Sequence, residues 1–269
     1  MNKNAPIGIF DSGIGGLTVA HAIKNVLPNE DLIYFGDTAH LPYGDKSTAT
    51  IQAYAIKIAD FLIKKKCKII VIACNSASAA ANDLLKEYVA SKATIINVIE
   101  PMVHYVAETC ENKTVGIIGT KQTINSNIYE DSINKSTELI KVKSLATPLL
   151  VPMIEEGFLH NRIAHDVIDK YLGNSELEKI EALVLGCTHY PLIKNEIDKY
   201  FNKKVKILDS SIITANYLKT FLIEKGLLNT STNVGENRFF VSDLTDSFEY
   251  SAKLFFGEPV VLEKYQLWE

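Results

Sequence analysis

The sequence predicts an α/β protein built from two pseudo-symmetric α/β lobes with mainly parallel sheets and an active site in the cleft between them. The first observation behind this prediction is that short apolar runs alternate with amphipathic helical patterns along the 269 residues. The second is a pattern that occurs twice, at residues 69–78 and 182–191: an apolar run, a cysteine, hydrogen-bonding side chains and a helix start. Such runs fit fully covered parallel strands, whose carboxyl ends carry the chemistry of open sheets, so two ends can share one anionic substrate.

Composition narrows the class of protein. Hydrophobic residues make up 47% of the chain and the net charge is −4, with no basic stripe, so neither nucleic acid nor a membrane surface is expected as a partner. The polar N-terminus carries no apolar signal region, and no run reaches bilayer length, so we expect a cytoplasmic location. Four cysteines without a CxxC pair fit a reducing compartment.

In the first half, strands and helices are predicted in alternation. Residues 7–10 read as a strand, and residues 11–16 as a glycine-rich turn into a helix over 17–27. This turn resembles a dinucleotide fingerprint only loosely, because it lacks the full glycine spacing and Asp11 puts negative charge where a pyrophosphate would lie. Asp11 also has a simpler interpretation as a helix-cap or turn residue. The further elements expected here are a strand over 32–35, a polar loop over 36–44, a helix over 48–65, a strand from 69, a helix over 78–90, a strand over 95–99 and a helix over 100–109.

The second half repeats the first. Residues 114–123 parallel the opening strand and turn, and Cys187 follows them at about the interval that separates Asp11 from Cys74. We therefore place residues 1–98 and 209–269 in the first lobe, with Asp11 and Cys74, and residues 99–208 in the second, with Cys187 and His189. The elements expected here are a strand over 114–118, a helical stretch over 148–157, a helix over 161–172, a strand over 182–186, a helix to about 201, a strand over 205–208, a helix over 212–225, and a strand over 239–241 with Ser242 and Asp243 capping a helix over 244–256.

Other chemistries of cysteine and histidine are less well supported. Cys187-x-His189 could belong to a zinc site, but the remaining cysteines and histidines show no paired ligand spacing, so no metal is expected. A cysteine hydrolase would use His189 as the base, yet His189 would have to fold back toward its own cysteine. Cys67 and Cys110 are expected to be inert packing residues. A thiol at a helix start is expected to ionise more easily than a free one.

Four motifs carry a resemblance to a known family. They are Asp11-Ser12-Gly13-x-Gly15-Gly16, Tyr34-Phe-Gly-Asp-Thr-Ala with Pro42-Tyr43-Gly44, Ala73-Cys74-Asn75-Ser76-Ala-Ser, and Leu185-Gly-Cys187-Thr188-His189-Tyr-Pro. In order and spacing, from near the N-terminus to about Pro191, they resemble the glutamate racemase family of the aspartate/glutamate racemase superfamily. The resemblance implies an isomerase without cofactor or metal that supplies D-glutamate for peptidoglycan in bacterial cell-wall synthesis.

The resemblance also implies roles for single residues. Cys74 and Cys187 would be the two acid/base residues, assisted by Asp11 and His189, with Glu155 a further assistant whose register against Glu156 stays open. L- and D-glutamate would be the substrates, and the protein would form a homodimer whose contact face no residue pattern identifies. The family often has threonine where this chain has Ser76, which keeps a hydroxyl. The implied substrate-binding residues are Asp11, Ser12, Tyr43, Gly44, Asn75, Ser76, Thr120, Thr123, Thr188 and His189.

The chemistry agrees with this resemblance, because inverting an α-carbon without a cofactor needs a base on one face and an acid on the other. Two matched cysteines can provide both groups. Plain interpretations remain for the rest: a turn at Pro42-Tyr43-Gly44 and a solvated pair of acids at Glu155 and Glu156. Two alternatives also remain, an aspartate-type racemase, which commonly has glutamate at the position of His189, and a non-catalytic amino-acid sensor.

Overall fold

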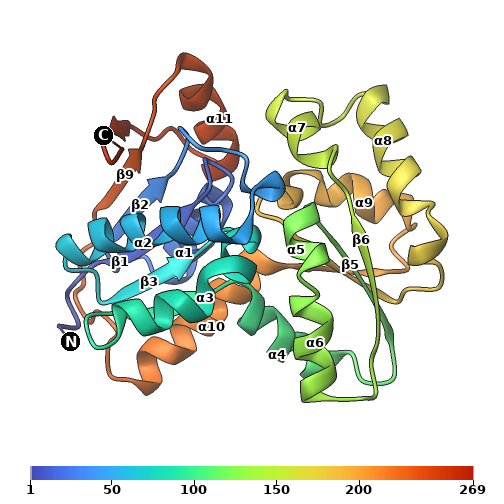
Figure 1. The fold of residues 1–269 in the computed structure, drawn as a ribbon, viewed down its shortest axis with the longest axis horizontal. Coiled ribbons are helices and arrows are strands. Elements are labelled where there is room, and N and C mark those ends of the chain that lie inside the picture. The colour runs from blue at the N-terminus through green and yellow to red at the C-terminus, as the bar shows by residue number, and fades with distance from the viewer. Residues whose placement is uncertain (1, 269) are drawn as a thin grey trace.

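The computed structural model describes residues 2–268 and contains two sheets, each of them all-parallel (Figure 1). The six-stranded sheet has the order β10-β9-β2-β1-β3-β4, and the four-stranded sheet has the order β6-β5-β7-β8. Each sheet is the centre of one lobe. The predicted α/β class with two lobes and parallel sheets is confirmed.

The first lobe takes strands from both ends of the chain. After β4 the chain leaves this sheet, and it returns with β9, which pairs with β2 so that Phe239 lies opposite Tyr34. The red C-terminal segment in Figure 1 accordingly lies beside the blue N-terminal one. The lobe limits at residues 98 and 208 stay predictions. The strands of the first sheet are β1 (Ile7–Asp11), β2 (Leu32–Gly36), β3 (Ile69–Ile72), β4 (Thr94–Asn97), β9 (Asn237–Val241) and β10 (Leu262–Lys264). Those of the second are β5 (Thr114–Gly119), β6 (Lys141–Ala146), β7 (Ala182–Gly186) and β8 (Lys206–Asp209).

The helices follow the strands and cover the sheets. In the first lobe α2 packs on α3, and α1 packs on α10 and α11. Side-chain oxygens cap the N-termini of several helices. Ser47 accepts a hydrogen bond from the backbone N–H of the third residue of α2, and Asn161 does the same for α8. The helices are α1 (Leu17–Val26), α2 (Thr48–Lys64), α3 (Asn75–Val89), α4 (Ile99–Thr109), α5 (Lys121–Asn125), α6 (Ile128–Ser136), α7 (Leu150–Glu155), α8 (Arg162–Leu172), α9 (Lys194–Tyr200), α10 (Ser210–Glu224) and α11 (Asp246–Phe256), with 3₁₀ turns η1 (Tyr43–Asp45), η2 (Ser175–Leu177) and η3 (Tyr190–Ile193).

Burial explains why the short apolar runs become central strands. Every residue of β1, β3 and β7 is buried, so these strands have no solvated face and need no polar alternation. Each fully buried Ile, Leu or Val contributes about 1.5–3 kcal/mol relative to an exposed one. Cys67 is buried just before β3, and Cys110 is buried at the end of α4, as expected for packing residues.

Several predicted boundaries are wrong. The helix expected over 78–90 begins at Asn75, because Cys74 itself occupies the N-cap position. The helix expected after Cys187 is broken into η3 and α9, with Pro191 in the first turn of η3. The last helix begins at Asp246, not at residue 244, and Asp243 is not its cap, since its carboxylate pairs with Lys264 at 2.7 Å.

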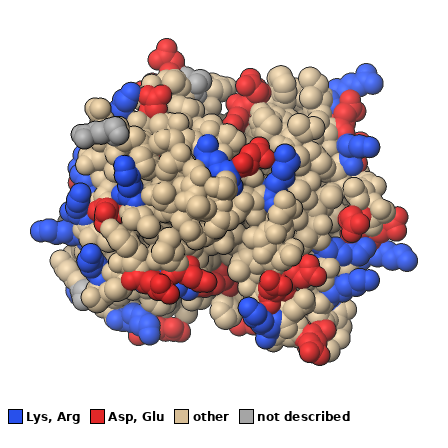
Figure 2. Space-filling view, viewed as in Figure 1, with Lys and Arg blue, Asp and Glu red and all other residues tan. Residues whose placement is uncertain are grey.

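The visible surface carries both signs of charge. On the face shown in Figure 2, lysine and arginine side chains are interspersed with aspartate and glutamate, without a stripe of one sign. No helix in the described part of the chain is long and apolar enough to cross a membrane.

Candidate active site

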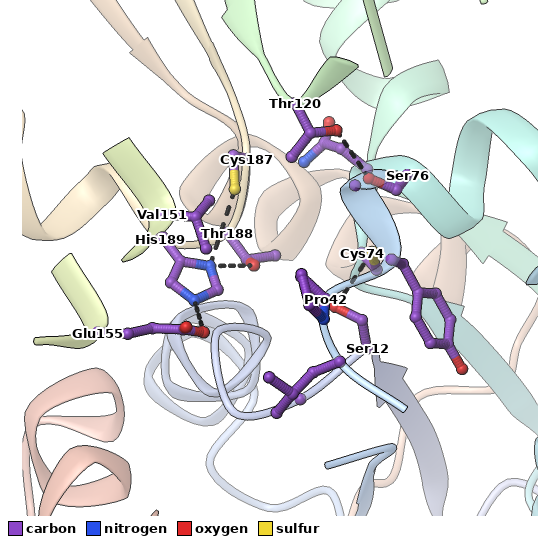
Figure 3. Close-up of a pocket in the computed structure, with 15 residues that line it drawn as sticks. Ser12, Pro42, Cys74, Ser76, Thr120, Val151, Glu155, Cys187, Thr188 and His189 are labelled. Carbon is purple, nitrogen blue, oxygen red and sulfur yellow. Dashed lines mark hydrogen bonds and ion pairs between the residues drawn. The ribbon is translucent and has the colours of Figure 1, made fainter. Parts of the chain in front are cut away.

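One cavity between the lobes receives both repeated cysteines. It is partly open to solvent, and Cys74 and Cys187 lie on different walls of it (Figure 3). Because Cys74 follows a strand of the first sheet and Cys187 a strand of the second, the cavity lies where the strand ends of the two sheets meet. The lining residues are Ser12, Gly13, Leu41, Pro42, Tyr43, Gly44, Cys74, Asn75, Ser76, Thr120, Val151, Glu155, Cys187, Thr188 and His189.

The end of β3 and the start of α3 fix Cys74. Its Sγ accepts from the backbone N–H of Ala77 at 3.4 Å and lies 3.7 Å from Ser12 Oγ. Burial raises the pKa of Cys74 to about 12, and the charge of Asp11 adds to this rise, while the Ala77 amide and Ser12 act against it. The expectation that a helix start eases ionisation is therefore wrong for this thiol, because desolvation outweighs the helix amides. Cys74 is a thiol at neutral pH.

Cys187 has a different neighbour, the imidazole of His189. The Nδ1 atom of His189 lies 3.7 Å from Cys187 Sγ, and its Nε2 atom lies 3.0 Å from Glu155 Oε1 (Figure 3). Burial lowers the pKa of His189, but the hydrogen bonds and charges of Cys187 and Glu155 together outweigh burial and raise it to about 10. His189 is thus an imidazolium at neutral pH. The sequence argument that His189 would not readily fold back toward its own cysteine is wrong, since it does so.

The tight turn before α1 makes room for this imidazole. A Cβ atom on Gly15 would lie 2.4 Å from His189 Cε1 and 2.6 Å from Thr188 Oγ1, which real Cβ contacts do not reach. Phe255 of α11 packs edge-on against the same ring, with the centroids 4.9 Å apart. Glycine at position 15 is therefore required for the imidazole to approach the first lobe so closely.

Of the paired glutamates, one lies beside His189 and the other faces solvent. Glu155 is the last residue of α7, lines the cavity and pairs with His189. Glu156 is exposed and does not line the cavity. Of the two acids that the sequence left open, Glu155 is the one beside the histidine.

Two expected binding residues lie behind the cavity wall. Asp11 is fully buried and does not line the cavity; its Oδ2 accepts from Gly13 N at 3.0 Å, while its Oδ1 is buried without a hydrogen-bond partner. Burial raises the pKa of Asp11, against the lowering effects of His189 and three backbone amides. Thr123 is also buried behind the wall, with its Oγ1 3.2 Å from Thr120 Oγ1. Both residues are placed to support their neighbours and do not form part of the cavity surface.

The other expected binding residues are brought together. Ser76 Oγ and Thr120 Oγ1 are 2.9 Å apart across the two lobes. Asn75 uses its Oδ1 to accept from Tyr129 at 2.7 Å, and its buried Nδ2 has no protein partner, so this amide remains available as a donor. The expected residues that line the cavity are Ser12, Tyr43, Gly44, Asn75, Ser76, Thr120, Thr188 and His189.

Sequence reasoning missed the apolar part of the wall. Leu41, Pro42 and Val151 line the cavity, and none of them carries a group that signals chemistry. The motif Pro42-Tyr43-Gly44 pointed to this loop, but Pro42 itself was not among the expected binding residues. Among the described residues, no three His, Cys, Asp or Glu side chains are grouped so that they could hold a metal ion.

Comparisons with known proteins agree with this geometry. The Asp/Glu/hydantoin racemase family matches residues 17–218. A glutamate racemase of Neisseria meningitidis is 40% identical over 97% of this chain and 96% of its own length. The structure of a glutamate racemase from Francisella tularensis in complex with D-glutamate is 44% identical, covers 98% of both chains and has a TM-score of 0.92. That of Thermus thermophilus in complex with β-chloro-D-alanine is 36% identical, covers 99% of both chains and has a TM-score of 0.87.

Proposed function

This chain belongs to the Asp/Glu/hydantoin racemase family, and we propose that it interconverts L- and D-glutamate by acid/base chemistry of Cys74 and Cys187, without a cofactor. The activity is supported by full-length relatives of about this size that are glutamate racemases, at 40% and 44% identity. The substrate is supported by the D-glutamate in the Francisella tularensis relative.

One observation carries the mechanism: two thiols from two lobes line a single cavity. Racemisation at an α-carbon requires that a proton leave one face while another arrives on the opposite face. A base and an acid on facing walls satisfy this requirement, whereas a binding protein or a hydrolase needs no second thiol. Each cysteine therefore serves as base in one direction and as acid in the other.

The surroundings of the thiols support a division of labour. His189 carries a positive charge beside Cys187 and stabilises the negative charge that forms on this sulfur when it acts as the base. On the resemblance to the family, Cys187 removes the proton of L-glutamate, while Cys74 faces it as a thiol. Cys74 then donates its proton from the other face and gives D-glutamate. The reverse direction begins with Cys74 as the base. Glu155 keeps His189 oriented and charged.

Binding and charge stabilisation are assigned to amides and hydroxyls. Asn75 Nδ2 has no protein partner, and Ser12, Ser76 and Thr188 present hydroxyls on the cavity wall. The N-terminus of α3 directs further N–H groups toward this region. Donors of this kind bind the substrate carboxylates and stabilise the charge that develops at the α-carbon. Asp11 and Thr123 support this wall from behind.

The product fits a role in the cell wall. D-glutamate made by this enzyme enters peptidoglycan synthesis, and we place the enzyme in the cytoplasm as a homodimer, on the resemblance to its family. Size-exclusion chromatography with light scattering tests the dimer, and a monomer at working concentration contradicts it.

The activity is tested with purified protein and no added cofactor. Circular dichroism should show L-glutamate and D-glutamate each approaching the racemic mixture, with aspartate turned over more slowly. In deuterated water the product should carry deuterium at the α-carbon from the first turnovers, because the donating thiol exchanges with solvent, while the remaining substrate stays protiated. Faster turnover of aspartate contradicts the substrate, and early label in the substrate contradicts the two-thiol mechanism.

A further inference from the structure

A buried carboxylate outside the catalytic pair joins three segments of the first lobe. Asp37 is fully buried at the end of β2. Its Oδ1 accepts from Ser242 Oγ at 2.8 Å and from Trp268 Nε1 at 2.8 Å. Its Oδ2 accepts from Tyr43 OH at 2.6 Å, and His40 Nδ1 lies 3.0 Å from Oδ1.

This cluster is connected to the cavity by the loop that carries Tyr43. Pro42, Tyr43 and Gly44 are all lining residues, and the ring of Tyr43 is buried. Burial and the charge of Asp37 raise the pKa of Tyr43 well above its ordinary value, so the hydroxyl stays protonated and donates to the carboxylate. The hydrogen bond therefore holds one wall of the cavity through a phenol whose hydroxyl is bonded to Asp37.

The C-terminal segment completes the cluster. Trp268 packs edge-on against His40 and Tyr54, with ring centroids 4.5 Å and 5.1 Å away, and Lys57 Nζ lies 5.0 Å from its ring centroid. The indole N–H is a donor only, and Asp37 is the acceptor it meets. A residue more than 200 positions along the chain from the loop thus contacts the carboxylate that holds the loop.

We propose that Asp37 is a positioning residue for the substrate-binding loop Pro42–Gly44, and that the Trp268 indole and the Ser242 hydroxyl act through it. Three neutral donors and the imidazole fix both oxygens of the Asp37 carboxylate, so the Tyr43 hydroxyl has its acceptor in a single position. With one donor missing, the carboxylate can rotate, and the loop samples positions that do not bind substrate. The proposal rests on the glutamate racemase activity and adds residues to it that touch no substrate.

The kinetic test uses Trp268→Phe, which removes the indole N–H and keeps an aromatic ring beside His40 and Tyr54. We expect the KM for both enantiomers to rise about fivefold with kcat within about twofold of the parent, because the loop is a binding wall and the thiols are untouched. The matched control is Tyr88→Phe, which removes an aromatic donor to Asp60 (2.8 Å) on the surface of the same lobe and should leave both constants unchanged.

A second measurement does not depend on turnover. Trp268 is the only tryptophan of the chain, so intrinsic tryptophan emission reports directly on this cluster. Titration with racemic glutamate, in which turnover changes no concentration, should give a saturable change in emission. Ser242→Ala keeps the reporter and removes another donor to Asp37, and its half-saturation should rise about fivefold. If Trp268→Phe does not fold, Ser242→Ala is used in its place for the kinetic test as well.

The outcomes separate the two proposals. A parent protein that racemises glutamate, with KM unchanged in Trp268→Phe and half-saturation unchanged in Ser242→Ala, overturns the positioning role alone. Emission that does not respond to saturating racemic glutamate in an active parent also overturns it. A parent that does not racemise glutamate overturns the proposed function, whatever the emission shows.

Discussion

At the level of single residues, the two thiols differ in their neighbours. Cys74 is desolvated beside the buried Asp11, whereas Cys187 lies beside a charged imidazole. Two thiols of the same chemistry therefore have different electrostatic surroundings. This asymmetry could not be predicted from the sequence, where both cysteines follow a buried strand and precede a helix, because the pKa of Cys74 depends on burial and on a residue 63 positions earlier in the chain.

The asymmetry leads to a prediction for a matched pair of variants. Cys74→Ala and Cys187→Ala should each lower the racemisation rate at least about 100-fold, because each lacks the acid or base for one face. The remaining thiol can still remove an α-proton and return a deuteron to the same face. In deuterated water, Cys74→Ala should label only L-glutamate and Cys187→Ala only D-glutamate, as measured by NMR. Racemisation at near the parent rate in either variant would refute the mechanism.

The neighbouring acids Glu155 and Glu156 offer a second matched pair. Glu155→Gln removes the negative charge that raises the pKa of His189, so kcat/KM should fall about tenfold. The activity that depends on the imidazolium should also be lost at lower pH than in the parent. Glu156→Gln changes an exposed residue and should leave the pH profile as it is. Equal profiles for the two variants would show that Glu155 does not tune His189.

Among the elements, the fully buried strands could be predicted, whereas the edge strands β6 and β10 could not. The strands β1, β3 and β7 are apolar runs without polar alternation, and their sequence alone identified them. The strand β6, with the sequence KVKSLA, lies at the edge of its sheet and has no buried residue. Its two lysines interrupt the apolar pattern, so the sequence did not indicate a strand there. The strand β10 is three residues long, and the short helices α5 and α6 were also missed.

The turn between β1 and α1 was predicted as a glycine-rich turn, but its purpose was not. The sequence argued against a dinucleotide fingerprint at this turn, but it did not indicate that Gly15 makes room for His189 from the other lobe. This contact joins residues 174 positions apart, and no local pattern encodes it. The same limit applies to Asp37 and Trp268, whose hydrogen bond depends on the C-terminal segment returning to the first sheet.

This turn gives a prediction at the level of the element. Gly15→Ala places a methyl group 2.4 Å from the present position of His189 Cε1, so the imidazole must move away. We expect kcat to fall at least about tenfold, since a displacement near 1 Å at the reacting groups is enough for a loss of this size. Thermal unfolding of the variant shows whether the fold is retained. Full activity in the Gly15→Ala variant would mean that His189 need not occupy this position.

The whole molecule joins its lobes by contacts around the cavity. Beyond the Ser76–Thr120 contact, Lys121 and Asp45 form an ion pair at 3.3 Å, and Gln122 donates to Thr48 at 3.2 Å. The ion pair is solvent-exposed on both sides, so it contributes at most about 1 kcal/mol. The buried His189 also lies between the lobes, because it touches Glu155 and Cys187 of its own lobe and faces Gly15 of the other.

The stability of the whole molecule should therefore depend on pH through His189. Its pKa rises from an ordinary value of 6.5 to about 10 in the folded protein, so the folded state binds a proton that the unfolded state releases between these values. The stabilisation is fully present below about pH 6.5 and is lost as pH rises toward 10, by up to about 1.4 kcal/mol per pH unit. The raised pKa values of Cys74 and Cys67 act in the same direction, but only above their ordinary value of 9.

Between pH 6.5 and 9, the raised pKa of His189 therefore acts on stability without a contribution from the raised pKa values of Cys74 and Cys67. We expect the free energy of unfolding in urea to fall with pH across this window in the parent protein. The variant His189→Gln should show a flatter dependence, because the other titratable groups are the same in both proteins. Measurements at pH 6.5, 7.5 and 8.5 give the two slopes. Parallel slopes would contradict a charged His189 in the folded state, and with it the role of this imidazolium beside Cys187.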